Sequence, residues 1–107
     1  QVKLAWGTDL LFNPMNTKNQ NQGILKLQKW FTNYEILRMV TYGNAQLLSL
    51  SGSRNPYPGR LGIIEENAWA DMIILDGNAM DNIDLLGDPG KNILLIMKGG
   101  EIFKNIL

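Results

Sequence analysis

The sequence predicts an α/β segment followed by a β segment, and three features of its 107 residues lead to that fold class. A short apolar run at residues 2–6 ends in Gly7-Thr8-Asp9, as expected of a strand that is buried on both faces and runs into a loop. Apolar residues at helical spacing follow, as far as about residue 50. Beyond residue 59 the spacing becomes that of extended strands, which predicts a small antiparallel unit.

Asp9 is the candidate catalytic residue, because it follows the predicted strand at its carboxyl end. In enzymes built on parallel strands, the chemistry takes place at that end. The chain contains no histidine and no cysteine, which are the usual partners of a catalytic or metal-binding carboxylate. A loop aspartate that accepts hydrogen bonds from nearby backbone amides is the structural alternative. The sequence does not separate two roles for Thr8: its hydroxyl could orient a substrate group, or it could form a hydrogen bond within its own loop.

The first helical segment is expected after a polar stretch, residues 13–22, which is rich in turn-forming side chains and predicts a mobile surface loop. In this loop Asn13 and Gln20, Asn21 and Gln22 could reach a substrate, although a flexible solvated loop is the commoner case. Apolar residues at helical spacing then predict one amphipathic helix over residues 24–31.

A second helix is predicted to begin near Asn33, because Thr32 and Glu35 have the spacing of a capping box. Gly43-Asn44 indicates a break and Ser51-Gly52 a stop, so we expect two short helices here. The aromatic side chains of Trp30, Phe31 and Tyr34 gather at the junction of the helices. We assign them to core packing in preference to a ligand platform.

The second half is predicted to begin after residues 53–59, which form the best candidate domain boundary. Gly99-Gly100 lies between two apolar runs and predicts a hairpin turn, since turns with positive φ at both central residues favour glycine. Adjacent Glu65 and Glu66 would point apart, so a solvated turn is expected in place of an acid/base pair. The β-prone runs are residues 61–64, 70–75, 93–97 and 102–103, and residues 76–89 form a loop with a helical turn at 81–86.

Composition excludes several classes of function. Ten basic and ten acidic residues cancel, so no long-range field draws in nucleic acid or an anionic membrane. The apolar runs are far shorter than the roughly 20 residues that cross a bilayer. The absence of cysteine fits a reducing compartment such as the cytoplasm without excluding the periplasm. Because the chain begins at Gln1 inside a predicted strand, we expect a truncated polypeptide.

Several motifs occur in an order that resembles the carboxyl-terminal part of metal-dependent amidohydrolases of the imidazolonepropionase and prolidase-like kind. The resemblance covers nearly the whole chain, and its tail is most similar to the branch that includes Xaa-Pro dipeptidases and related carboxypeptidases. Where that branch often has proline after the Gly-Asn pair, this chain has Ala79. The motifs are Gly7-Thr8-Asp9, residues 32–38, residues 41–48, residues 62–65, residues 70–78 and residues 96–102.

The resemblance implies a (β/α)8 barrel with an accompanying β-sandwich. Residues 1–52 would supply the last strand and helices of the barrel, and residues 53–107 strands of the sandwich. Asp9 matches the family's aspartate at the end of the last barrel strand, which helps to hold a divalent metal, commonly zinc, and accepts a proton from metal-bound water. Such chemistry is reasonable, since zinc lowers the pKa of bound water to near 7. Asp71 would be a structural residue that fixes the entry to a strand.

The resemblance also implies hydrolysis of an amide or other non-ester C–N bond in a peptide-like substrate, by the complete enzyme. The metal's other ligands belong to the absent amino-terminal barrel portion, so we expect the isolated chain to be inactive and to hold no metal. Substrate-binding residues are not assigned. The expected partners are that barrel portion and a further copy of the chain. A stand-alone β-rich interaction module, in which Asp9 is incidental, is the alternative.

Overall fold

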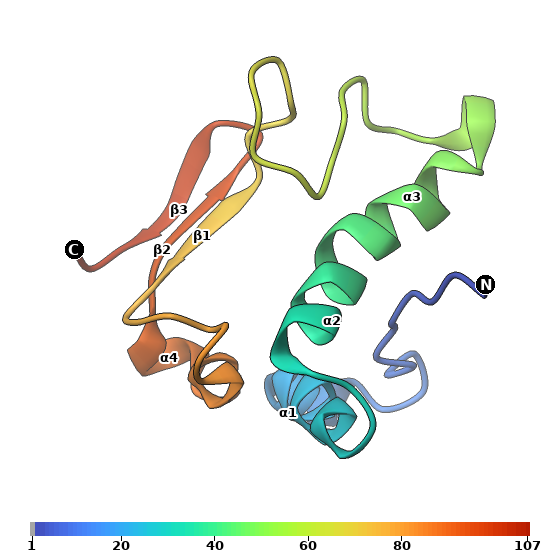
Figure 1. The fold of residues 1–107 in the computed structure, drawn as a ribbon. Coiled ribbons are helices and arrows are strands. Elements are labelled where there is room, and N and C mark those ends of the chain that lie inside the picture. The colour runs from blue at the N-terminus through green and yellow to red at the C-terminus, as the bar shows by residue number, and fades with distance from the viewer. Residues whose placement is uncertain (1) are drawn as a thin grey trace.

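The computed structural model describes residues 2–107, with helices in the first half of the chain and a small sheet in the second. In Figure 1, α2 and α3 run as one rod on one side, the strands lie on the other, and α1 and α4 lie at the same end. The α-helices are α1 (Gln20–Leu25), α2 (Asn33–Arg38), α3 (Asn44–Ser49) and α4 (Pro89–Asn92), and the strands are β1 (Met72–Leu75), β2 (Ile93–Lys98) and β3 (Glu101–Asn105). The 3₁₀ segments are Pro14–Asn19, Lys26–Lys29, Gly52–Arg54 and Ile83–Gly87, and Met39–Gly43 is π-helical.

The strand predicted at residues 2–6 is wrong for this structure. Residues 2–10 have no regular secondary structure, and the side chains of Val2 and Leu4 are 83% and 50% exposed. A buried strand needs neighbouring strands to pair its backbone N–H and C=O groups. Within residues 2–107 the sheet consists of β1, β2 and β3, and none of them pairs with this segment.

The irregular conformation predicted for residues 13–22 is also wrong, whereas their position at the surface is confirmed. Pro14 begins a 3₁₀ helix, a position that suits its fixed φ and missing N–H, and α1 follows at Gln20. The side chains of Asn21 and Gln22 donate to the carbonyl groups of Leu86 and Gly87 at 2.8 and 2.9 Å. These distant bonds hold the segment in place. The helix predicted over residues 24–31 begins at Gln20, four residues before its predicted start. It continues as a 3₁₀ segment that ends at Lys29, two residues before its predicted end.

The predicted capping box at the start of α2 is confirmed. The Thr32 hydroxyl accepts from the Glu35 N–H at 3.3 Å, and the Glu35 carboxylate accepts from the Thr32 N–H at 2.8 Å. The prediction of two separate short helices is wrong, because α2, Met39–Gly43 and α3 follow one another without a break. The glycine interpreted as a break instead ends the π-helical segment.

The hairpin at Gly99-Gly100 is confirmed, with φ of 57° and 84° at the two glycines. The sheet has the order β1-β2-β3 and is antiparallel throughout. No strand forms at residues 61–64, contrary to expectation. Gly62 has a φ of 73°, and a Cβ there would lie 2.7 Å from the Thr41 carbonyl oxygen, so this segment turns against the helix and does not extend the sheet.

The core lies where the two halves of the chain meet. Ile36 of α2 and Ile83 and Leu86 of the Ile83–Gly87 turn are buried, with Leu75 of β1 packed against them. Phe31 contributes to this cluster, as predicted. The core assignment is wrong for its aromatic neighbours Trp30 and Tyr34, which are 71% and 57% exposed. In residues 2–107, no helix combines the length and the apolar character that crossing a membrane requires.

Asp71 has the structural position expected of it. Its Oδ1 accepts a hydrogen bond of 2.7 Å from the Gly99 N–H, and the neighbouring Gly100 N–H donates to the Ala70 carbonyl at 3.0 Å. The entry to β1 is therefore tied to the turn between β2 and β3. Asp71 and Gly99 lie just beyond Met72 and Met97, the last pair of the β1–β2 ladder, so this contact extends the connection past the end of the ladder.

Replacement of Asp71 by alanine is expected to lower the free energy of unfolding by about 1 kcal/mol, because one exposed hydrogen bond to a charged acceptor is lost. Asp71→Asn retains an oxygen acceptor and should lose less. Urea denaturation followed by circular dichroism measures both variants. Equal losses would show that the acceptor to Gly99 is not the stabilising feature.

Glu35 gives the capping box a pH dependence. The hydrogen bond from the Thr32 N–H, and then that from the Thr32 hydroxyl, lower the pKa of the Glu35 carboxyl below its ordinary value. A lowered folded-state pKa contributes stability that is present above the unfolded pKa and is lost as the pH falls through the folded value. We therefore expect Glu35→Gln to lower the melting temperature at pH 7 by more than at pH 3. Glu66→Gln, at an exposed turn, should show no such difference between the two pH values.

Candidate functional site

Asp9 lies on the surface at the end of the irregular segment, and its backbone has a φ of 50°. Aspartate is one of the few residues other than glycine that adopts this left-handed conformation at modest cost. Within residues 2–107 its carboxylate accepts no hydrogen bond, so it does not bond the amides of its own loop. Such unusual backbone conformations occur often, although not exclusively, at functional sites. The exposed turn residue Asn67, with a φ of 66°, is a structural example in the same chain.

The segment before Asp9 is held by the helical half of the chain. The Trp6 N–H donates to Asn44 Oδ1 at 2.7 Å, across 38 positions of sequence. Sequence reasoning missed Asn44, because Gly43-Asn44 was interpreted as a helix break. The available signal was that apolar residues keep their helical spacing beyond Asn44, which places this amide side chain on a continuous helix where it needs a hydrogen-bond partner.

A cavity of about 430 Å³ adjoins the Asp9 loop and opens between it and the first helical segment. Gln20 and Gln22, two of the loop residues considered for substrate contact, line it together with Thr8. Asn21 instead donates to the Leu86 carbonyl. The remaining lining residues are Trp6, Leu10, Asn16, Asn19, Gly23 and Lys26, so amide side chains and one cation dominate the wall.

The residues described by the structure do not form a metal site by themselves. In residues 2–107, no three histidine, cysteine, aspartate or glutamate side chains come together in a way that could hold an ion. A catalytic zinc site usually has three protein ligands. Asp9 is therefore not part of such a three-residue group within the described chain.

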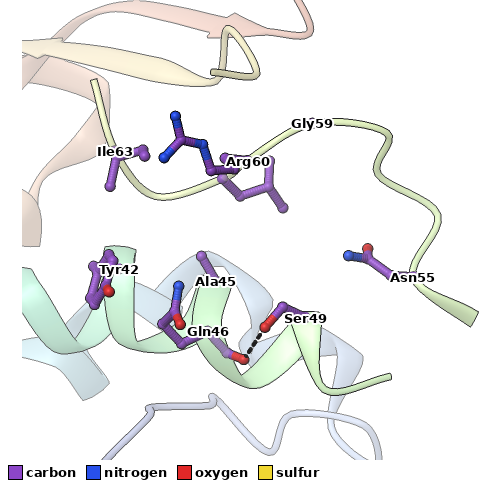
Figure 2. Close-up of a pocket in the computed structure, with 9 residues that line it drawn as sticks. Tyr42, Ala45, Gln46, Ser49, Asn55, Gly59, Arg60 and Ile63 are labelled. Atoms are coloured by element: carbon purple, nitrogen blue, oxygen red, sulfur yellow. Dashed lines mark hydrogen bonds between the residues drawn. The ribbon is translucent and has the colours of Figure 1, made fainter. Parts of the chain in front are cut away.

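A second cavity, of about 320 Å³, lies between the helix around α3 and the chain at residues 55–63. Figure 2 shows Tyr42, Gln46 and Ser49 along the helix. Arg60 lies across the cavity from them, on an irregular segment. Arg60 forms an ion pair with Glu65. Glu65 and Glu66 are both exposed where the chain bends and turns, as predicted. None of the predicted site residues lines this cavity.

No family model matches the sequence, and no curated protein does. Solved structures do match. A crystal structure of an amidohydrolase is 31% identical, with a TM-score of 0.80. A prolidase complexed with N-methylphosphonate-L-proline is 29% identical, with a TM-score of 0.79. Each match covers 97% of this chain and 23% of the solved chain, so the chain resembles one part of amidohydrolase and prolidase structures.

Proposed function

We propose that these residues are the carboxyl-terminal part of a metal-dependent hydrolase that cleaves amide or other non-ester C–N bonds. The observation that carries the proposal is the likeness to amidohydrolase and prolidase structures over 97% of the chain. Residues 1–52 would be the last strand and helices of a barrel, and residues 53–107 part of a β-sandwich. The N-methylphosphonate-L-proline in one of those structures supports a dipeptide with carboxyl-terminal proline as the substrate class.

Asp9 is the residue we assign to the chemistry. It would provide one oxygen ligand to a divalent metal, zinc by preference, in the complete polypeptide. At the same carboxylate it would accept and return a proton during hydrolysis, as carboxylates do in general acid–base catalysis. Because the described residues bring no three such side chains together, the other ligands would come from the rest of that polypeptide.

The isolated 107-residue chain is therefore expected to be inactive. The assay is release of proline from Xaa-Pro dipeptides, with and without added zinc, by the purified chain. Turnover above that of a buffer blank with the same zinc would overturn this proposal. An Asp9→Asn sample assayed in parallel would show whether any such turnover depends on Asp9.

Exposed apolar side chains support a part of a larger protein over a stand-alone interaction module. Val2 is 83% exposed, Leu47 of α3 is 58% exposed, and Phe103 of β3 is 63% exposed. A monomeric module is expected to bury such side chains. Size-exclusion chromatography separates the two proposals: the isolated chain should self-associate or bind the missing barrel portion. A stable monomer that binds neither would favour the module.

A further inference from the structure

We propose that Asn44 is a positioning residue for Asp9, which it holds through the backbone of Trp6. The functional half of this inference rests on the proposed role of Asp9. The structural half does not, since it concerns which contacts fix residues 4–9 against the helix. Nothing in the sequence pattern joins Asn44 to this segment, and the two are brought together by the fold alone.

Both ends of the Asn44 side chain are engaged, each by a different backbone group. Its Oδ1 accepts from the Trp6 N–H at 2.7 Å, and its Nδ2 donates to the Val40 carbonyl at 3.4 Å. The two bonds agree on one orientation of the amide, because an amide nitrogen donates and an amide oxygen accepts. Asn44 therefore presents its oxygen to the segment that leads to Asp9.

The π-helical segment Met39–Gly43 prepares this orientation. The backbone N–H of Asn44 donates to the carbonyl groups of Met39 and Thr41 and passes over that of Val40. The Val40 carbonyl accepts from the Asn44 side chain instead. Short π-helical segments occur frequently at functional sites. Here the altered register holds the Asn44 amide with its oxygen facing Trp6.

Two glycines allow the segment to approach this closely. A Cβ on Gly43 would lie 2.8 Å from the Leu4 carbonyl oxygen, and a Cβ on Gly23 would lie 2.9 Å from the Trp6 ring. Both distances are shorter than ordinary carbon contacts of about 3.5–4.0 Å, so larger residues would displace the segment. Leu4 and Trp6 are thus fixed on either side, three to five residues before Asp9.

Within the described chain these contacts hold residues 4–6 without strand pairing, and a barrel strand at residues 2–6 of the complete polypeptide would add its pairing to them. A segment that is exposed and unpaired has many backbone conformations open to it. The Asn44 bond removes that freedom at Trp6, next to the residues that set the direction of the Asp9 backbone. We therefore expect loss of the Asn44 oxygen to loosen residues 4–9 while the core around Ile36 and Ile83 stays intact.

The test compares three variants of the complete polypeptide that contains these residues. Asn44→Leu removes the acceptor, whereas Asn44→Asp retains an oxygen acceptor in the same place. Asn33→Leu is the matched control, because Asn33 also makes one long-range bond from a helix, with Nδ2 donating to the Met80 carbonyl at 3.0 Å. Hydrogen exchange, measured by mass spectrometry on peptides that cover residues 2–10, reports the Trp6 amide.

We expect exchange of the slowest amide in these peptides to rise about fivefold to tenfold in Asn44→Leu, as for loss of one ordinary hydrogen bond. Exchange in Asn44→Asp should rise less than in Asn44→Leu, because Asn44→Asp keeps an acceptor for the Trp6 N–H but loses the donor to the Val40 carbonyl, and Asn33→Leu should stay near the parent rate. An unchanged rate in Asn44→Leu, or an equal rise in Asn33→Leu, overturns the structural half. If Asn44→Leu does not fold, Gly43→Ala gives the result, because alanine favours the helix while its Cβ displaces Leu4.

Hydrolysis by the same variants tests the functional half. For Asn44→Leu we expect kcat to fall about 10- to 100-fold with KM near the parent value, as for misplacement of a catalytic group. Asn44→Asp, which keeps the acceptor for the Trp6 N–H, should retain more of kcat than Asn44→Leu. Normal kcat in a variant with faster exchange would overturn the positioning role. No hydrolysis by the parent polypeptide would count against the proposed function, while the exchange result would still decide the contact.

Discussion

Replacement of Ile83 by alanine is expected to lower the free energy of unfolding by about 2–5 kcal/mol. Ile83 is 1% exposed and packs with Ile36 and Leu86, where the helical half meets the sheet. Removal of three buried carbons leaves a cavity that the neighbouring backbone cannot fill. Since domains are stable by only about 5–15 kcal/mol, this one change should remove a large share of the free energy of unfolding.

Urea denaturation followed by far-ultraviolet circular dichroism measures this effect. Ile64→Ala is the matched control, since the same side chain is 89% exposed there. It should change the free energy of unfolding by no more than about 0.5 kcal/mol. Similar losses in the two variants would mean that Ile83 is not buried in the folded chain, and the described core would be incorrect.

If the proposed function is correct, replacement of Asp9 by asparagine should lower kcat of the complete polypeptide by about 10²- to 10⁴-fold. Asparagine has nearly the same shape as aspartate, but it does not accept a proton or carry the negative charge that a metal ligand supplies. The free energy of unfolding should hardly change, because the Asp9 side chain is exposed and bonds nothing within residues 2–107.

The measurement is the hydrolysis of Xaa-Pro dipeptides, together with the bound metal determined by atomic emission. Asp84→Asn is the control, since Asp84 is exposed and accepts a bond only from the Gln28 amide within the described residues. It should retain the parent kcat. Parent activity in Asp9→Asn would remove Asp9 from the chemistry, even if the polypeptide proves to be a hydrolase.

Local features of the fold could be predicted from sequence because their causes lie within a few residues. The capping box needs only Thr32 and Glu35, and the hairpin needs only glycine at two adjacent positions with positive φ. The loop at residues 13–22 was misjudged because its order depends on distant partners. Asn21 and Gln22 donate to carbonyl groups 65 positions further along the chain.

The two missing strands have a related cause. Residues 2–6 and 61–64 have the composition of strands, but a strand also needs a neighbour, and residues 2–107 do not provide one. Gly62 instead turns its segment against Thr41, with a positive φ that only glycine adopts readily. Composition predicts which segments could extend, whereas pairing decides which of them do so.

The candidate site shows the same division. Asp9 could be selected from its place after an apolar run, since that argument uses adjacent residues only. Asn44 could not be linked to the site, because its contact with Trp6 spans 38 positions and depends on a π-helical segment that no local pattern predicts.

The reading frame immediately upstream of Gln1 tests the central proposal most directly. If these residues are the end of a metal-dependent amidohydrolase, that sequence should encode a barrel whose early strand is followed by a His-x-His pair. The chain spans 23% of the solved chains it resembles, so the upstream part should be about three times as long. A start site close to Gln1 with a stop codon before it would contradict the proposal and favour a stand-alone module.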